Sequence, residues 1–113
     1  MSKADPATAA EYRESMTEGQ LQDCVVELAR TLGYLVYHTY DSRRSAEGFP
    51  DLVMVLEETG RLLFVELKST KGRISAAQQF WLAALSLAKG HEVHVWRPRD
   101  WHSGRIEEVL RRW

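Results

Sequence analysis

The first clear pattern along the chain is a set of apolar residues with the three- and four-residue spacing of an amphipathic helix. Its members are Leu21, Cys24, Val25, Leu28, Ala29 and Leu32. Gly33 follows as a stop signal, and Thr17 with Gln20 three residues later has the form of a capping box. The pattern predicts a helix over about 17–32.

The next segments have the composition of strands. Residues 34–40 are rich in aromatic and β-branched side chains, and a polar loop with glycine and proline follows over 41–50. Two apolar runs at 51–56 and 62–68 are separated by a short polar segment, which is the pattern of a hairpin. Three consecutive strands are therefore expected, and the last two should pair antiparallel.

A second helix is predicted between Ser75, which can cap its start, and Lys89, with Gly90 as a stop signal. Its apolar positions are Ala77, Phe80, Trp81, Ala84, Leu85 and Ala88.

The remaining chain predicts a fourth strand at 93–96, ended by Pro98, and a short C-terminal helix over 105–112. The strand that follows the crossover helix should run parallel to its partner. The order is helix, three strands, helix, strand, helix. We therefore expect an α/β fold with a mixed four-stranded sheet flanked by helices.

Length and composition limit the classes of protein to consider. A chain of 113 residues with 44% hydrophobic and 27% charged residues can form one core but not two, so we expect one domain at 16–113 after a flexible segment at 1–15. No apolar run reaches the roughly 18 residues of a membrane span, so no membrane partner and a cytoplasmic location are expected. The single cysteine, Cys24, excludes a disulfide framework or a cysteine-rich zinc site.

The net charge of −1 does not favour a non-specific nucleic-acid binder, but the charge is unevenly distributed. Acidic residues are in excess over 1–40, and basic residues are in excess over 76–113. Basic character is thus confined to loops and the C-terminal part.

Three charged residues converge at one end of the predicted hairpin. Asp51 opens the first strand, and Glu66 and Lys68 lie near the end of the second, on the same face because strand side chains alternate. One explanation is a surface ion pair, because a Glu-X-Lys triplet alone is weak evidence. The other is a site in which two carboxylates hold a hard divalent cation beside a lysine.

Three motifs in the order of the chain resemble the Pro-Asp…Glu-X-Lys, or PD-(D/E)XK, nuclease superfamily, and more narrowly its VRR-NUC (virus-type replication-repair nuclease) branch in the stand-alone form found in phages. They are GFPDL at 48–52, FVELKS at 64–69 and KGRISAAQQFWL at 71–82. The resemblance extends over about 17–101. It implies a restriction-endonuclease-like core of the order α-β-β-β-α-β, which agrees with the order expected from periodicity.

The resemblance also implies a metal-dependent phosphodiesterase. Asp51 and Glu66 would bind Mg²⁺ or Mn²⁺, the carbonyl of Leu67 would complete the coordination, and Lys68 matches the catalytic lysine. Glu18 matches an acidic residue that the family places at the start of its first helix, as a further catalytic and metal-binding group. The alternative for Glu18 is a first-turn acid that favours the helix dipole.

Gln78 matches a catalytic glutamine in the family's second helix. Its alternative role is to complete a capping box with Ser75, and the two roles are compatible. Gln79 is the competing candidate, but it is turned by about 100° around the helix.

Candidate DNA contacts are basic and polar side chains near this site. They are Arg43, Arg44, Lys71, Arg73 and Gln22. The alternative for Arg43 and Arg44 is a solvated loop pair, and Gln22 can contact either DNA or a metal-bound water. His38 can also reach substrate, although a lone strand histidine is more often structural. The other histidines share no ligand spacing, and we assign no tryptophan to DNA.

We therefore expect an endonuclease that acts on branched DNA, such as the four-way Holliday junction, in replication, recombination or repair in a bacterial or phage-infected cell, without a nucleotide cofactor. The alternatives are a non-catalytic DNA-binding or assembly module, and a nuclease of the same fold with duplex or exonucleolytic specificity. A homodimer is expected, because one small chain offers a small DNA footprint. The candidate interface is the C-terminal segment with Trp101, Ile106, Val109, Leu110 and Trp113, which can equally pack on its own sheet.

Overall fold

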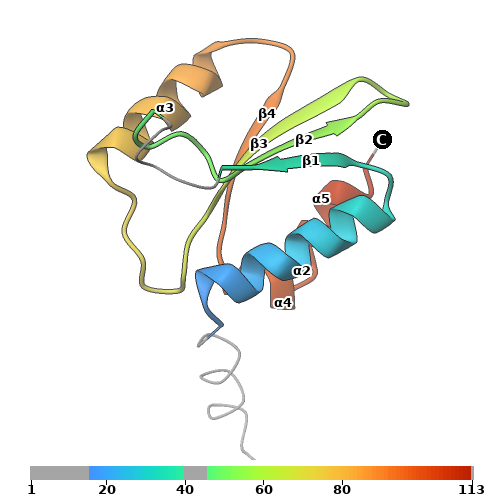
Figure 1. The fold of residues 1–113 in the computed structure, drawn as a ribbon, viewed down its shortest axis with the longest axis horizontal. Helices are drawn as coiled ribbons and strands as arrows, with labels where there is room; N and C mark the ends of the chain where they lie inside the picture. The colour runs from blue at the N-terminus through green and yellow to red at the C-terminus, as the bar shows by residue number, and fades with distance from the viewer. Residues whose placement is uncertain (1–15, 40–45, 113) are drawn as a thin grey trace, which may run out of the picture.

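The elements of the fold follow the predicted order. The computed structural model describes residues 16–39 and 46–112, and the expected flexible segment at 1–15 lies outside these ranges. In chain order the elements are α2 (Glu18–Thr31), β1 (Leu35–His38), β2 (Leu52–Leu56), β3 (Arg61–Leu67), α3 (Ala76–Leu87), β4 (Glu92–Trp96), α4 (Pro98–His102) and α5 (Arg105–Leu110) (Figure 1).

The four strands form one mixed sheet in the order β1-β2-β3-β4. The first two pairs are antiparallel, and β4 runs parallel to β3. Helices α2, α4 and α5 cover one face of the sheet, and α3 lies on the other near β4 (Figure 1). The predicted mixed sheet flanked by helices is confirmed.

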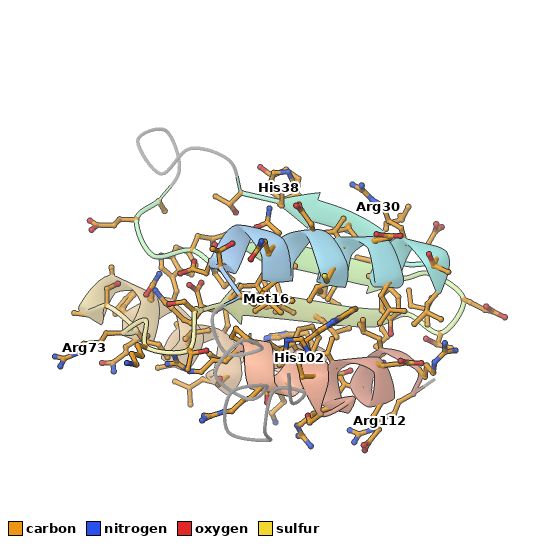
Figure 2. All side chains as sticks on the ribbon, turned by 90° about the horizontal axis from the view of Figure 1, so that it is seen from below. Met16, Arg30, His38, Arg73, His102 and Arg112 are labelled. Carbon is orange, nitrogen blue, oxygen red and sulfur yellow. The ribbon has the colours of Figure 1, made fainter. Side chains whose placement is uncertain are left out.

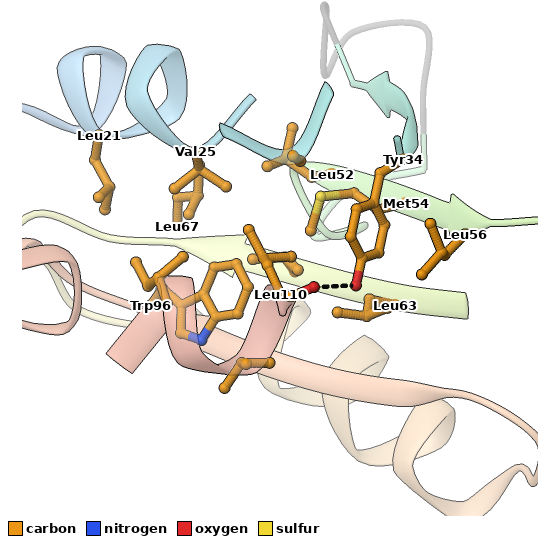
Figure 3. Packing of buried hydrophobic residues seen from close by; sticks show 14 residues of the cluster. Leu21, Val25, Tyr34, Leu52, Met54, Leu56, Leu63, Leu67, Trp96 and Leu110 are labelled. Carbon is orange, nitrogen blue, oxygen red and sulfur yellow. Dashed lines mark hydrogen bonds between the residues drawn. The ribbon is translucent and has the colours of Figure 1, made fainter. Parts of the chain in front are cut away.

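The core lies between the sheet and the layer of α2 and α5 (Figure 3). Alternate residues of β2 and β3 point into it, as the two-residue period of a strand requires. The Tyr34 hydroxyl crosses this core and donates a 2.8 Å hydrogen bond to the carbonyl of Leu110. The fully buried members include Leu21, Val25, Leu52, Met54, Leu63, Val65, Ile106, Val109 and Leu110.

The C-terminal segment packs on its own sheet. Ile106, Val109 and Leu110 have no exposed surface, and Trp101 packs against the same core. The prediction that this segment forms a dimer interface is therefore wrong for these buried side chains, because their apolar area is already used inside the chain. Trp113 lies outside the described residues.

Helix α3 covers its face of the sheet only in part. The ring of Phe49 makes edge contacts with Trp81 of α3 and with Phe64 of β3, at centroid distances of 5.1 and 6.1 Å. No residue of α3 is fully buried, and Phe80 and Leu87 are 71% and 84% exposed. The expected apolar positions of this helix therefore do not all face the sheet.

Helix α4 was not predicted, because Pro98 was interpreted only as the end of a strand. Proline also fits the first position of a helix, since the missing N–H has no partner there in any case. Asp100 accepts a 2.8 Å hydrogen bond from the backbone N–H of Arg97 and so caps this short helix. In the part of the chain that the structure describes, no helix is long and apolar enough to cross a membrane.

Candidate active site

The β2–β3 hairpin brings the three predicted charged residues together. Its register pairs Leu52 with Val65, so Asp51, one residue before β2, lies opposite Glu66. The carboxylate of Asp51 accepts a 2.8 Å hydrogen bond from the backbone N–H of Leu67. This bond holds the Asp51 carboxylate across the hairpin from the Glu66 side chain.

Glu66 and Lys68 are buried, with 1% and 9% of their surface exposed, and they are the only buried charged residues in the described ranges. The ammonium Nζ of Lys68 lies 3.9 Å from Oε2 of Glu66. Replacing such a pair by apolar residues is often neutral or stabilising, so stability alone does not account for it. The surface ion pair considered from the sequence is therefore not what the fold contains.

The carboxyl groups of Asp51 and Glu66 repel each other when both are charged. The pKa of Glu66 is raised from 4.5 to about 8, because burial and, to a lesser degree, the neighbouring Asp51 disfavour its charged form more than Lys68 favours it. Close carboxylates with a raised pKa are typical of functional sites. The oxygen donors of Asp51 and Glu66, with the adjacent Leu67 carbonyl as a backbone oxygen, suit a hard divalent cation, whose charge would remove their repulsion.

Gln78 joins α3 to this site. Ser75 and Gln78 form a complete capping box, in which the Gln78 side-chain oxygen accepts the N–H of Ser75 over 2.8 Å. The amide Nε2 of the same side chain donates a 2.9 Å hydrogen bond to Oε2 of Glu66. The capping role of Gln78 and its position at the candidate site thus coexist, whereas Gln79 is exposed.

Glu18 lies near the same carboxylates without forming a three-residue cluster with them. It is an exposed residue of the first turn of α2, and its charge contributes to the raised pKa of Glu66. Within the described residues, no group of three or more His, Cys, Asp or Glu side chains is arranged to hold a metal ion. Metal binding by Glu18 therefore stays a prediction.

Gln22 lies further along α2, in an open groove of about 500 Å³ between this helix and β1. His38 at the end of β1 lines the same groove, together with the acidic Asp23 and Glu27 and the basic Arg30. Two acidic side chains against one basic side chain do not favour a phosphate backbone. The groove gives Gln22 no support as a DNA contact, which stays a prediction.

The four basic residues predicted to contact DNA belong to two different segments of the chain. Lys71 and Arg73 are exposed in the loop between β3 and α3, and Figure 2 shows Arg73 on the outside of the molecule at the end occupied by α3. Arg43 and Arg44 lie outside the described residues. The N–H of Thr39 donates a 2.9 Å hydrogen bond to the carbonyl of Asp51, so the chain leaves β1 beside the site.

Arg97 is a residue near the site that the sequence analysis did not identify. Its Nη1 atom donates to the carbonyls of Ser69, Thr70 and Gly72 at 2.7, 3.3 and 2.8 Å. Gly72 in turn lies against Lys68, since a Cβ added there would be 3.4 Å from Cδ of Lys68. Arg97 therefore organises the loop that follows Lys68, a contact for which the sequence carries no local signal.

Comparison with known proteins identifies the family of this chain. The family model of the VRR-NUC domain matches residues 9–99. The chain belongs to the VRR-NUC family. The predicted resemblance is confirmed over most of its length, and the protein is a VRR-NUC nuclease domain.

Two individual relatives support this assignment. A Fanconi-associated nuclease 1 homolog from Schizosaccharomyces pombe is 32% identical over 66 residues, which cover 58% of this chain and 9% of that protein. A solved VRR_NUC domain structure is 23% identical and aligns with a TM-score of 0.63 over 85% of this chain and 96% of that chain. The VRR-NUC fold, a mixed sheet flanked by helices of the PD-(D/E)XK type, is thus common to both chains.

Proposed function

We propose that this VRR-NUC domain is a metal-dependent endonuclease that hydrolyses phosphodiester bonds in DNA. The observation that carries the proposal is the position of Asp51 opposite Glu66 at the end of the hairpin, with the ammonium of Lys68 3.9 Å from Glu66. Two carboxylates and one lysine, held at strand ends by backbone pairing, suit phosphodiester hydrolysis with a divalent cation. A family relative named as a nuclease supports the same chemistry.

Each site residue has a defined task in this proposal. Asp51, Glu66 and the carbonyl of Leu67 would hold Mg²⁺ or Mn²⁺, with Glu18 as a further acidic group at the edge. A cation held there would supply Lewis-acid activation of the phosphate and of an attacking water. Lys68 places a positive charge where negative charge develops on the phosphate oxygens. Gln78 fixes the orientation of the Glu66 carboxylate through its 2.9 Å hydrogen bond.

The proposed substrate is branched DNA, such as a four-way junction. Exposed Lys71 and Arg73 would contact phosphates on one side of the site, and Arg43 and Arg44 are proposed to do so on the other. The relative from Schizosaccharomyces pombe carries the name Fanconi-associated nuclease 1 homolog, but this chain spans only 9% of its length. Its name therefore supports only nuclease activity here, and the branched substrate is proposed from the site and its basic surroundings.

We also propose that the working unit is a homodimer formed through α3 and not through the C-terminal segment. Helix α3 contains no charged residue, and its exposed Phe80 and Leu87 stand seven residues apart with Ala83 and Ala84 between them. An antiparallel copy would place Phe80 against Leu87 of the second copy, with small alanines at the crossing. Such a two-fold contact is self-complementary.

The dimer geometry would suit paired incisions. Gln78 lies between five and six residues from the midpoint of Phe80 and Leu87, so the two Gln78 residues would be separated along the helix direction by roughly 16 Å. Two equivalent sites would then face two strands of one junction. The dimer also doubles the basic surface of a chain whose net charge is −1.

The experiment that tests the proposed function is incubation with labelled four-way junction, flap, duplex and single-stranded DNA, each in Mg²⁺ and in EDTA. The expected result is cleavage of the junction by paired nicks in Mg²⁺ and none in EDTA. DNA binding without cleavage of any substrate would instead support the non-catalytic module. Preferred cleavage of the duplex, or digestion from DNA ends, would support the alternative specificity, and equal cleavage of all substrates would contradict the proposed preference for branched DNA.

A further inference from the structure

Gly48 makes an unusually close backbone contact with the first turn of α3. A Cβ atom added at Gly48 would lie 2.4 Å from the carbonyl carbon of Ala77, 2.5 Å from its oxygen and 2.7 Å from the nitrogen of Gln78. All three are backbone atoms, so they cannot move aside as a flexible side chain can. The φ angle of +85° adds a second requirement for glycine at this position.

The contact joins the two segments that deliver groups to the candidate site. Gly48 lies three residues before Asp51, and the peptide that it touches joins Ala77 to Gln78. The side chain of Gln78 then donates its 2.9 Å hydrogen bond to Glu66. The next residue of the loop, Phe49, contacts Trp81 one turn further along α3, so the loop and the helix are packed together over more than one turn.

We infer that Gly48 is a positioning residue, which lets the loop before Asp51 lie directly against α3 and so sets the distance from the amide of Gln78 to the carboxylate of Glu66. A side chain at position 48 would push the first turn of α3 away from the loop. The 2.9 Å hydrogen bond has little tolerance for such a shift, since hydrogen bonds weaken steeply beyond about 3.2–3.5 Å. The assignment of Glu66 as a metal ligand rests on the proposed function, but the Gly48–Gln78 contact does not.

The chain provides matched controls for this inference. Gly90 and Gly104 have φ angles of +90° and +84°, close to that of Gly48, but a Cβ at either position would meet nothing within 4 Å. Gly90→Ala and Gly104→Ala therefore carry the backbone strain without the collision. Any effect of Gly48→Ala beyond theirs reports the contact with α3.

The experiment compares Gly48→Ala with these controls in the full ¹⁵N-labelled chain without metal. The side-chain amide resonances of Gln78 are assigned by their loss in Gln78→Ala. We expect Gly48→Ala to move these resonances and both controls to leave them in place. Spectra are recorded at low temperature with a stabilising osmolyte, so that a destabilised variant stays folded. Unchanged Gln78 resonances in a folded Gly48→Ala chain would overturn the inference.

A second measurement on the same variants is single-turnover cleavage at saturating DNA. We expect Gly48→Ala to slow cleavage about 10–100-fold, as is typical when a group that orients a metal ligand is lost. In a Gln78→Ala background the same substitution should cause little further loss, because Gly48 acts through Gln78. An equal loss in both backgrounds would contradict this, as would a Gly48→Ala chain that does not fold at all. If no variant cleaves but the resonances move as expected, the proposed function fails and the positioning contact stands.

Discussion

The carboxylate of Asp51 accepts the backbone N–H of Leu67 at 2.8 Å, which ties the start of β2 to the end of β3. Leu67 is flanked in sequence by Glu66 and Lys68, so one hydrogen bond holds Asp51 beside both of the other charged groups of the site. The position of the site is thus set by hairpin register and not by a flexible loop. Sites on strands are more rigid than sites on loops, which suits a metal centre.

Lys68→Ala should suppress cleavage more than metal binding. An ammonium group does not coordinate a cation, but it stabilises negative charge on a phosphate, and loss of one such group costs about 100-fold or more in rate. Calorimetric titration with Mn²⁺ measures metal affinity, and single-turnover cleavage measures the rate. A large loss of Mn²⁺ affinity with the cleavage rate preserved would show that the proposed role is wrong.

Arg97→Gln should destabilise the chain and slow cleavage, because the carbonyls of Ser69, Thr70 and Gly72 lose a shared charged donor. The expected decrease in the free energy of unfolding is about 1–3 kcal/mol. Arg99→Gln is the matched control, since Arg99 is an exposed arginine two residues away, and its effect should stay within about 0.5 kcal/mol. Urea denaturation measures the stability of both variants. Equal effects of the two substitutions would contradict the role of Arg97 in organising the loop that follows Lys68.

The metal-free chain should lose stability as the pH rises from about 4.5 to about 8. The pKa of Glu66 is raised from 4.5 to about 8, so over this interval the folded state keeps a proton that the unfolded state releases. Folding is therefore favoured at the acid end, and this contribution is lost as the pH rises through the folded-state pKa. Urea midpoints measured in EDTA over this pH range, for the wild type and for Glu66→Gln, isolate the contribution of Glu66. The same pH slope in both chains would contradict the assignment.

Phe80→Glu should convert the proposed dimer to a monomer, because it places a charge in the centre of an apolar helix contact. Sedimentation at micromolar concentration should give about twice the 13.0 kDa chain mass for the wild type and the single mass for the variant. Tyr37→Glu is the control, as Tyr37 is also largely exposed but lies on β1. A wild-type monomer, or a dimer that persists in Phe80→Glu, would contradict the α3 interface.

Local sequence signals were sufficient to predict most of the elements. Both capping boxes, at Thr17 and at Ser75, are present, because a cap depends on residues within one turn. The hairpin and the convergence of Asp51 with Glu66 follow from two apolar runs and the two-residue period of strands. These features depend on short sequence separations, so a single chain is enough to predict them.

Features that depend on distant parts of the chain were missed or left open. Arg97 meets carbonyls that are 25–28 residues away in the sequence, and no periodicity encodes such a contact. The apolar residues of α5 fit either an interface or the core, and only the position of α5 beside α2 and the sheet decides for the core. The exposure of Phe80 likewise depends on where α3 docks on the sheet.

Single-turnover cleavage of a labelled four-way junction in Mg²⁺ by the wild type, Asp51→Asn and Glu66→Gln shows whether the two carboxylates form the catalytic metal site. The amides keep the size of the carboxylates but lose the charge that a hard cation requires. We expect cleavage by the wild type and none by either variant, with the fold and junction binding of both retained. Cleavage by either purified variant at a rate near that of the wild type would contradict this expectation.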